Sequence, residues 1–106
     1  MNGRKFLIDD VLEEFKKMDV FNITVINTPD YLTDYFVVGS VDNVITLGSI
    51  VDKFRSFGVR VHGEPSSGWV ILDFGDFWCH IFLPNIRDYY NIERLWSLRS
   101  AMKESI

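Results

Sequence analysis

One stretch of the sequence, residues 69–83, restricts the fold more than any other. It predicts two strands, 69–74 and 77–83, joined by a tight turn at Gly75 and Asp76. In the second strand one face carries Phe77, Cys79, Ile81 and Leu83, and the other carries Trp78, His80 and Phe82. A sheet with two apolar faces has to be covered on both sides, by helices or by a partner.

The rest of the chain supplies helices and further strands around this hairpin. Apolar residues recur at helical spacing in two segments, and a third helix is predicted near the end. The predicted helices are 4–18, 42–57 and 92–102, and the further strands are 21–26, 35–38 and 59–62. The order is helix, strand, strand, helix, three strands, helix. This order predicts an α/β fold with a mixed sheet of about five strands and helices packed on it.

The second predicted helix has identifiable ends. Ser40 or Asp42 is expected to cap its start, and Gly58 is placed to end it. Gly48 lies in its middle, where glycine is unfavourable relative to alanine by about 1 kcal/mol. Close packing of the helix on the sheet would explain why Gly48 is tolerated there.

Length and charge exclude several classes of function. The chain has 106 residues, which suits a single domain covering 1–106. Its formal net charge of -4 disfavours direct binding of nucleic acid, because an acidic chain gains nothing from releasing phosphate counterions. The single cysteine, Cys79, excludes an internal disulfide and a cysteine-based zinc site. No apolar run approaches a membrane span or a signal peptide, so a cytoplasmic protein is expected. No cofactor is expected, and no metal, because His62, Cys79 and His80 lack zinc-ligand spacing.

An enzymatic alternative rests on Gly39 and Ser40, which follow a buried strand and open a helix. Nucleotidyltransferases hold a phosphate with a Gly-Ser at such a helix start. They also need paired carboxylates for magnesium on a neighbouring strand, and this chain offers only Asp73 and Asp76 around the hairpin turn. Those two acids are expected instead to satisfy turn amides. The enzymatic reading is therefore the alternative and not the main prediction.

Aromatic residues indicate a binding surface. They number 16 of 106, more than a small interior hides easily, so some are expected on a face that another protein covers. His80 lies among these rings, and without a paired nucleophile it is interpreted as a hydrogen-bonding group of a binding face. Arg87 and Tyr90 are of the residue types enriched at binding hot spots, whereas Trp96 is expected to close the core.

Several spaced motifs resemble the ribosomal silencing factors, also called Iojap-like proteins. The similarity runs over nearly the whole chain. It is carried by the segments 33–38 (TDYFVV), 68–76 (GWVILDFGD), 80–82 (HIF) and 87–96 (RDYYNIERLW). The chain departs from the family pattern at 39–44, which is more acidic than usual, at His62, and at Trp78 and Cys79. The resemblance implies a single Iojap-like domain with a fold similar to nucleotidyltransferases but without their catalytic carboxylates.

The resemblance also implies a function that is not enzymatic. Family members bind the large ribosomal subunit through its protein number fourteen, block joining of the small subunit and so repress translation; homodimers are also implied. A chain of charge -4 is expected to bind a basic protein patch on the ribosome and not its phosphates. The residues expected to bind this partner are Trp69, Ile71, His80, Arg87 and Tyr90, with Asp73 and Asp76 as a polar rim. Whether Trp69, Ile71 and His80 share one face depends on strand register.

Overall fold

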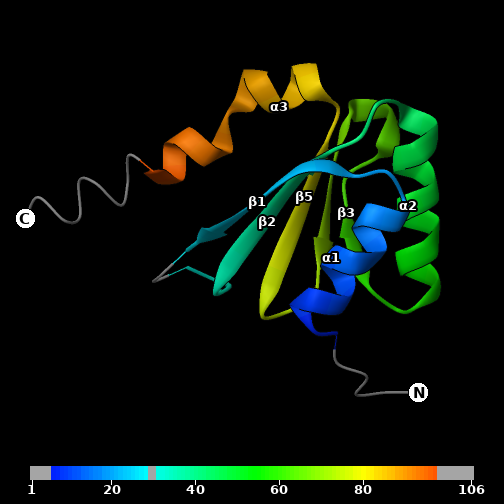
Figure 1. Ribbon diagram of the computed structural model, residues 1–106, viewed down its shortest axis with the longest axis horizontal. Helices are drawn as coiled ribbons and strands as arrows, with labels where there is room; N and C mark the ends of the chain where they lie inside the picture. Colours follow the sequence, from blue (N-terminus) through cyan, green and yellow to red (C-terminus); the bar gives the residue numbers. More distant parts are fainter. Residues whose placement is uncertain (1–5, 29–30, 98–106) are drawn as a thin grey trace, which may run out of the picture.

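A five-stranded mixed sheet forms the centre of the molecule (Figure 1). The computed structural model describes residues 6–28 and 31–97. The helices are α1 (Ile8–Lys17), α2 (Val44–Ser56) and α3 (Pro84–Tyr90), with a 3-10 turn, η1 (Pro65–Ser67). The strands are β1 (Phe21–Asn27), β2 (Tyr35–Ser40), β3 (Arg60–His62), β4 (Trp69–Asp73) and β5 (Phe77–Phe82). Residues 92–97 are also helical, so the predicted order of elements is confirmed. Positions 98–102 of the predicted helix 92–102, and 4–5 of the predicted helix 4–18, lie outside the described residues.

The strands lie in the order β1-β2-β5-β4-β3. β2 and β5 are parallel, and the other neighbouring pairs are antiparallel. The predicted hairpin forms as β4 and β5, with Gly75 at its turn in a left-handed conformation (φ 88°). The run at 35–38 was expected to be central, and β2 is indeed central and buried over most of its length.

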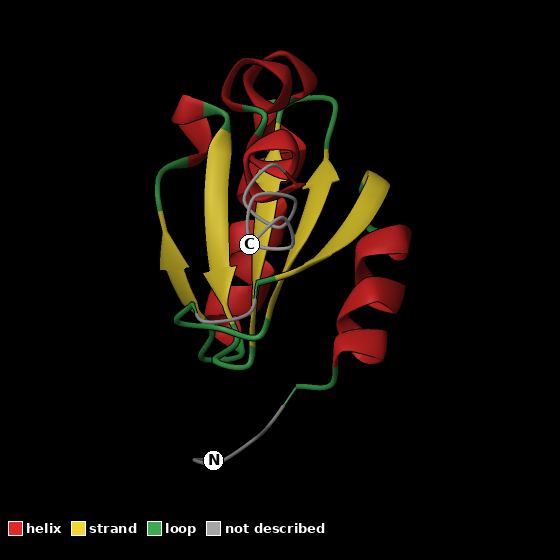
Figure 2. Ribbon diagram, turned by 90° about the vertical axis from the view of Figure 1, so that its left-hand side faces the viewer, coloured by secondary structure: helices red, strands yellow, loops and turns green. Residues whose placement is uncertain are grey.

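One face of the sheet is covered by α1 and α2, and we call it the closed face. Figure 1 shows both helices on the same side of the strands, and Figure 2, turned by 90° so that the left-hand side of Figure 1 faces the viewer, shows α2 behind them. Phe15 of α1 meets Phe54 of α2 edge to face, with ring centroids 5.6 Å apart. Glu14 and Lys53 form an ion pair between the same two helices. The core on this face consists of Val11, Phe15, Val20, Val37, Val41, Leu47, Ile50, Val51, Phe54, Val59, Val70, Leu72, Phe77, Cys79 and Ile81.

The opposite face, here called the open face, has a smaller core of buried residues: Phe36, Val38, Phe82 and Trp96. Its cover comes from α3 and from residues 92–97, which lie toward the top of Figure 1 away from α1 and α2. Trp96 is 8% exposed, which confirms that it closes the core. Trp69, Trp78 and Ile86 are only partly buried there. The helices of this small domain therefore cover one face fully and the other in part.

Two predictions about α2 are wrong. Its N-cap is Asn43, whose side chain accepts a hydrogen bond from the Thr46 N–H at 2.8 Å, and neither Ser40 nor Asp42. A Cβ added at Gly48 would meet no atom within 4 Å, so close packing does not explain this glycine. The predicted end is correct, since Gly58 follows the helix with a φ of 84°.

Two buried threonines fix the loop that leads into β2. The Thr28 hydroxyl donates to the carbonyl of Thr33 at 2.8 Å, and the Thr33 hydroxyl donates to the carbonyl of Gly75 at 3.0 Å. The backbone N–H of Asp34 also donates to the carbonyl of Asp76 at 3.0 Å. This loop and the hairpin turn are therefore tied together at one end of the sheet. Within the described ranges, no helix is long and apolar enough to cross a membrane.

Candidate functional site

The candidate site is the open face around β4 and β5. Strand register places Ile71 opposite His80 and Trp69 opposite Phe82. Residues directly opposite in an antiparallel pair lie on the same face, so Trp69, Ile71 and His80 share one face. The structure thus settles the register that sequence parity left open.

Trp69 contacts two of the other predicted binding residues, His80 and Tyr90. Its indole Nε1–H donates to Nδ1 of His80 at 3.2 Å. Its ring stacks on Phe82 with centroids 4.9 Å apart and contacts Tyr90 at 4.8 Å. Trp69 is partly exposed and Tyr90 is 51% exposed, so this aromatic pair reaches the surface.

His80 lies beneath this pair and is only 4% exposed. Burial disfavours the charged imidazolium and lowers the pKa of His80 to about 4, so the ring is neutral at neutral pH. The ring contacts Phe36 at 4.5 Å between centroids. His80 was predicted to contact the partner directly, but its burial places it below the exposed surface of the free protein.

Two hollows lie on this face, and Trp69 and Ile71 line both of them. The larger hollow has a volume of about 480 Å³, and the smaller, next to His62 and Gly63, has about 230 Å³. The larger one is walled by rings that the site prediction left out, including Tyr31, Phe36 and Trp78. The signal for Trp78 was present in the sequence, because it alternates with Cys79 and shares a face with His80. Tyr31 lies in the loop before β2, where no strand or helix pattern could place it.

Arg87 holds the partial cover in place. Its Nε and Nη2 donate to the two carboxylate oxygens of Glu93 at 2.8 and 3.0 Å, and its Nη1 donates to the Ser40 hydroxyl at 2.8 Å. Such a two-pronged pair is stronger than a single neutral hydrogen bond. Arg87 therefore ties α3 and the segment after it to the end of β2, and its side chain is only 11% exposed.

Asp73 and Asp76 lie at the hairpin turn. The Asp73 carboxylate accepts from the Gly75 N–H at 2.8 Å, which confirms its predicted role at the turn, and lies 3.8 Å from Nε2 of His62. Because β2 and β5 are parallel, with Tyr35 beside Phe77 and Ser40 beside Phe82, the hairpin turn and Ser40 lie at opposite ends of the sheet. The phosphate-holding and metal-holding halves of the enzymatic alternative are therefore not brought together. In the part of the chain that the structure describes, no group of three His, Cys, Asp or Glu residues could hold a metal ion.

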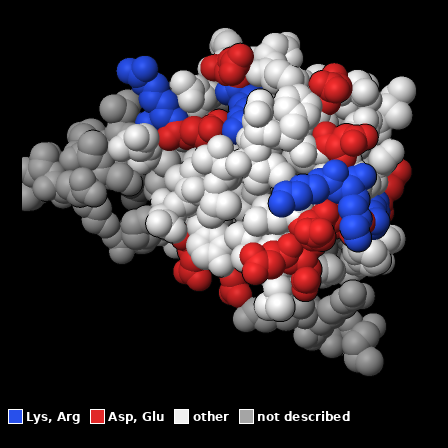
Figure 3. Space-filling model, in the orientation of Figure 1, with Lys and Arg blue, Asp and Glu red and all other residues white. Residues whose placement is uncertain are grey.

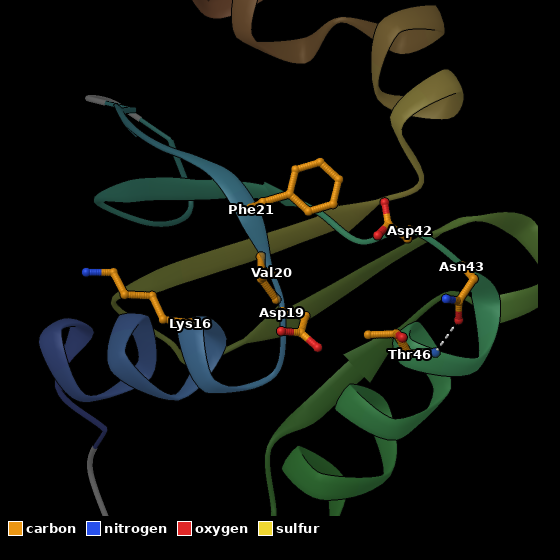
Figure 4. Close-up of a pocket in the computed structure, with 7 residues that line it drawn as sticks. All are labelled: Lys16, Asp19, Val20, Phe21, Asp42, Asn43 and Thr46. Atoms are coloured by element: carbon orange, nitrogen blue, oxygen red, sulfur yellow. Dashed lines mark hydrogen bonds between the residues drawn. The ribbon is translucent and has the colours of Figure 1, made fainter.

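A third hollow lies at the start of α2 and has a volume of about 460 Å³ (Figure 4). A helix start can bind an anion, but here Asp19 and Asp42 line the hollow and Asn43 already caps the helix. Lys16 extends away from the two carboxylates in Figure 4. Ser40, the expected phosphate ligand or cap, is buried and bonded to Arg87 instead. This end of the molecule is thus unsuited to a phosphate.

Comparison with known proteins gives a consistent result. A family model described as "Ribosomal silencing factor during starvation" matches residues 6–106. The chain is 34% identical over 110 residues to the mouse (Mus musculus) protein named "Mitochondrial assembly of ribosomal large subunit protein 1", covering 92% of this chain and 48% of that protein. It is 27% identical over 97 residues to "Ribosomal silencing factor RsfS" of Zymomonas mobilis, covering 85% of this chain and 72% of that protein. The chain thus spans about half the length of the mouse relative.

The fold also has a counterpart among solved structures. A crystal structure of a protein from Chromobacterium violaceum superposes with a TM-score of 0.70 at 27% identity, covering 87% of this chain and 88% of that one. The predicted α/β class with a five-stranded mixed sheet is therefore confirmed.

Proposed function

Because this chain belongs to the ribosomal silencing factor family, we propose that it binds the large ribosomal subunit through protein number fourteen of that subunit and sterically blocks association with the small subunit. The result is repression of translation. Members of the family are non-enzymatic ribosome-binding factors, so the chain is not an enzyme. The name of the mouse relative, which refers to assembly of the large subunit, supports the choice of subunit.

The observation that carries the proposal is the incomplete cover of the open face. Trp69 and Tyr90 form a partly exposed aromatic pair, and Ile71 lines the same two hollows as Trp69. Aromatic side chains are enriched among the residues that dominate binding energy at protein interfaces. We assign Trp69, Ile71 and Tyr90 to direct contact, with His80 supporting Trp69 from below and Arg87 positioning α3.

Charge favours a protein partner over ribosomal RNA. The net charge of -4 opposes approach to phosphates, whereas it favours a basic protein surface. Figure 3 shows that acidic side chains outweigh basic ones on the side of the molecule that it draws. Asp73 and Asp76, at the hairpin turn, belong to the acidic rim of the proposed interface.

The test is sedimentation of the purified protein with separated ribosomal subunits. We expect co-sedimentation with large subunits only, and fewer joined ribosomes when small subunits are added afterwards. Trp69→Ala should weaken binding several-fold, because it truncates the central aromatic contact. Ile45→Ala is the control. Ile45 is 78% exposed and belongs to α2, the helix that covers the closed face, so it lies away from the proposed interface. Full binding by Trp69→Ala would contradict the assignment of the interface, and binding to neither subunit would contradict the function.

Two related predictions remain to be measured. A homodimer is expected from the family resemblance, and sedimentation equilibrium of the free protein would detect it. Cytoplasmic location is also a prediction; the relatives described above come from a bacterium and, by name, from mitochondria.

A further inference from the structure

The larger hollow on the open face has the properties of a built binding cavity. Its volume of about 480 Å³ falls within the range of about 300–1,000 Å³ that is typical of ligand pockets. Phe36 and His80, both buried, contribute to its wall, whereas Tyr31 and Leu95 are 42% and 63% exposed at its margin. The cavity is thus apolar inside and continues outward into exposed apolar side chains.

One polar group in this wall has no partner. The indole N–H of Trp69 can only donate, so Nδ1 of His80 must accept, and the proton of the neutral imidazole is on Nε2. Nε2 lies on the side of the ring away from the β5 backbone. It is buried and makes no hydrogen bond with the described residues. A buried N–H donor without a partner is unfavourable, so this part of the wall favours an oxygen atom to which Nε2–H can donate.

We propose that this cavity receives one neutral apolar side chain of the docking partner, together with a neutral oxygen, such as the adjoining main-chain carbonyl, that accepts the Nε2–H hydrogen bond of His80. This inference rests on the function proposed above and names the contact that the partner makes. None of the nine lining residues carries a formal charge at neutral pH. A lysine or arginine would lose its hydration there and would bring donors to a donor, so basic side chains of the partner are excluded from the cavity.

A protein segment fits this site better than a free small molecule does. A small molecule would fill the cavity but leave Tyr31, Leu95 and Tyr90 exposed around it. A protein surface would cover these margins as well as fill the hollow. Charge and shape thus act in different places: acidic groups attract the partner, and the uncharged cavity selects the residue that enters.

His80→Phe is the primary test. It keeps an aromatic ring of similar shape and removes the Nε2–H donor together with the acceptor of the Trp69 indole N–H, so its stability at neutral pH should change little. We expect this variant to bind large subunits about five-fold more weakly than the unmodified chain, the effect of losing about one hydrogen bond. A second variant, Ile71→Trp, should block the cavity from its wall and reduce binding further. Cys79→Ala is the matched control, since Cys79 is the neighbour of His80 in β5 and faces the closed core.

The outcomes separate the two proposals. If the unmodified chain fails to bind large subunits, the proposed function fails. If the unmodified chain, His80→Phe and Ile71→Trp all bind equally, the function stands and the cavity proposal is overturned. If Ile71→Trp converts a dimer into a monomer without weakening subunit binding, a second copy of the chain occupies the cavity, and the proposal is again overturned. In the supporting case, the Trp69 indole N–H resonance should also shift when the partner binds, since it is bonded to the same imidazole.

Discussion

The two faces of the sheet differ in how fully the rest of the chain covers them. The closed face is finished by α1 and α2, and every member of its core is an apolar residue or the buried thiol of Cys79. The open face has fewer fully buried residues, and its partly exposed rings carry N–H and O–H groups, in Trp69, Trp78 and Tyr31. Apolar side chains that are buried in the core stabilise the fold but select no partner. Half-buried tyrosine and tryptophan rings give a partner apolar contact area, and their O–H and N–H groups can form hydrogen bonds of defined direction with it. The difference shows which face serves folding and which is left for binding.

The largest expected effect comes from the closed face. Phe15 is fully buried between α1 and α2, so Phe15→Ala should reduce the free energy of unfolding by about 3–5 kcal/mol. Urea denaturation followed by circular dichroism would measure this. Ile71→Ala, a truncation on the open face, should have a clearly smaller effect because Ile71 is only partly buried. Equal losses in the two variants would contradict the distinction between the faces.

Acid should weaken the open face selectively. The pKa of His80 is about 4 in the folded protein and about 6.5 when unfolded, because the buried ring resists protonation. Between these pH values the unfolded chain binds more protons than the folded protein does. The contribution of His80 to the free energy of unfolding is therefore fully present above pH 6.5 and is lost as the pH is lowered toward 4, a loss of at most about 3 kcal/mol. Among the described residues, no charged side chain lines the cavity beside His80.

Urea denaturation at several pH values would test this, with His80→Phe as the comparison. That variant should lose less stability than the unmodified chain between pH 7 and pH 4.5, and the remaining loss would report on carboxylates elsewhere. Parallel pH profiles for the two proteins would show that His80 is not the titrating group.

The hydrogen bonds of Arg87 to Glu93 and Ser40 should stabilise the cover of the open face. Arg87→Ala removes three hydrogen bonds to Glu93 and Ser40, so a loss of about 1–3 kcal/mol in the free energy of unfolding is expected. Arg94→Ala is the control, because Arg94 is exposed in the same segment and should change stability by less than about 0.5 kcal/mol. Thermal unfolding of both variants gives the comparison. Similar melting temperatures would mean that the hydrogen bonds of Arg87 contribute little to stability.

The smallest effect is a gain in the helix that covers the closed face. Gly48→Ala should raise the free energy of unfolding by about 0.5–1 kcal/mol, because alanine reduces the entropy lost on folding and its Cβ meets no atom within 4 Å. Chemical denaturation resolves such a difference. Destabilisation would show that α2 packs more tightly at this position than the structure indicates.

Hydrophobic alternation was sufficient to predict most of the fold. The two strands of the hairpin and the assignment of Phe77 and His80 to opposite faces follow from a period of two, which depends only on the pleat of a strand. The turn between them follows from the residue types of Gly75 and Asp76. The cap of α2 could not be chosen from sequence, since Ser40, Asp42 and Asn43 are all acceptable cap residues and the backbone decides among them. Gly48 was misinterpreted because a glycine by itself does not indicate whether its position lies on the packed face of a helix or on the outer face.

The candidate site was predictable only in part. The same-face relation of Trp69 and Ile71 follows from strand parity, but the hydrogen bond from Trp69 to His80 depends on the register between strands. Tyr31 entered the cavity wall through a loop, and loops carry no periodic signal. Arg87 was expected at a partner surface, yet Glu93 and Ser40 hold it within the protein, because proximity in the fold is invisible in a linear pattern.

The parallel pairing of β2 with β5 has a consequence for how the chain folds. These two central strands are separated in sequence by α2, β3 and β4, so the middle of the sheet closes only after β5 has formed. Non-local pairing of this kind slows folding relative to a hairpin, so we expect β4 and β5 to associate first and β2 to join them later. Until then one long edge of β2 lacks its neighbour. A nascent chain that has not yet emerged beyond β4 would therefore expose an unpaired strand, which is a recognised starting point for aggregation.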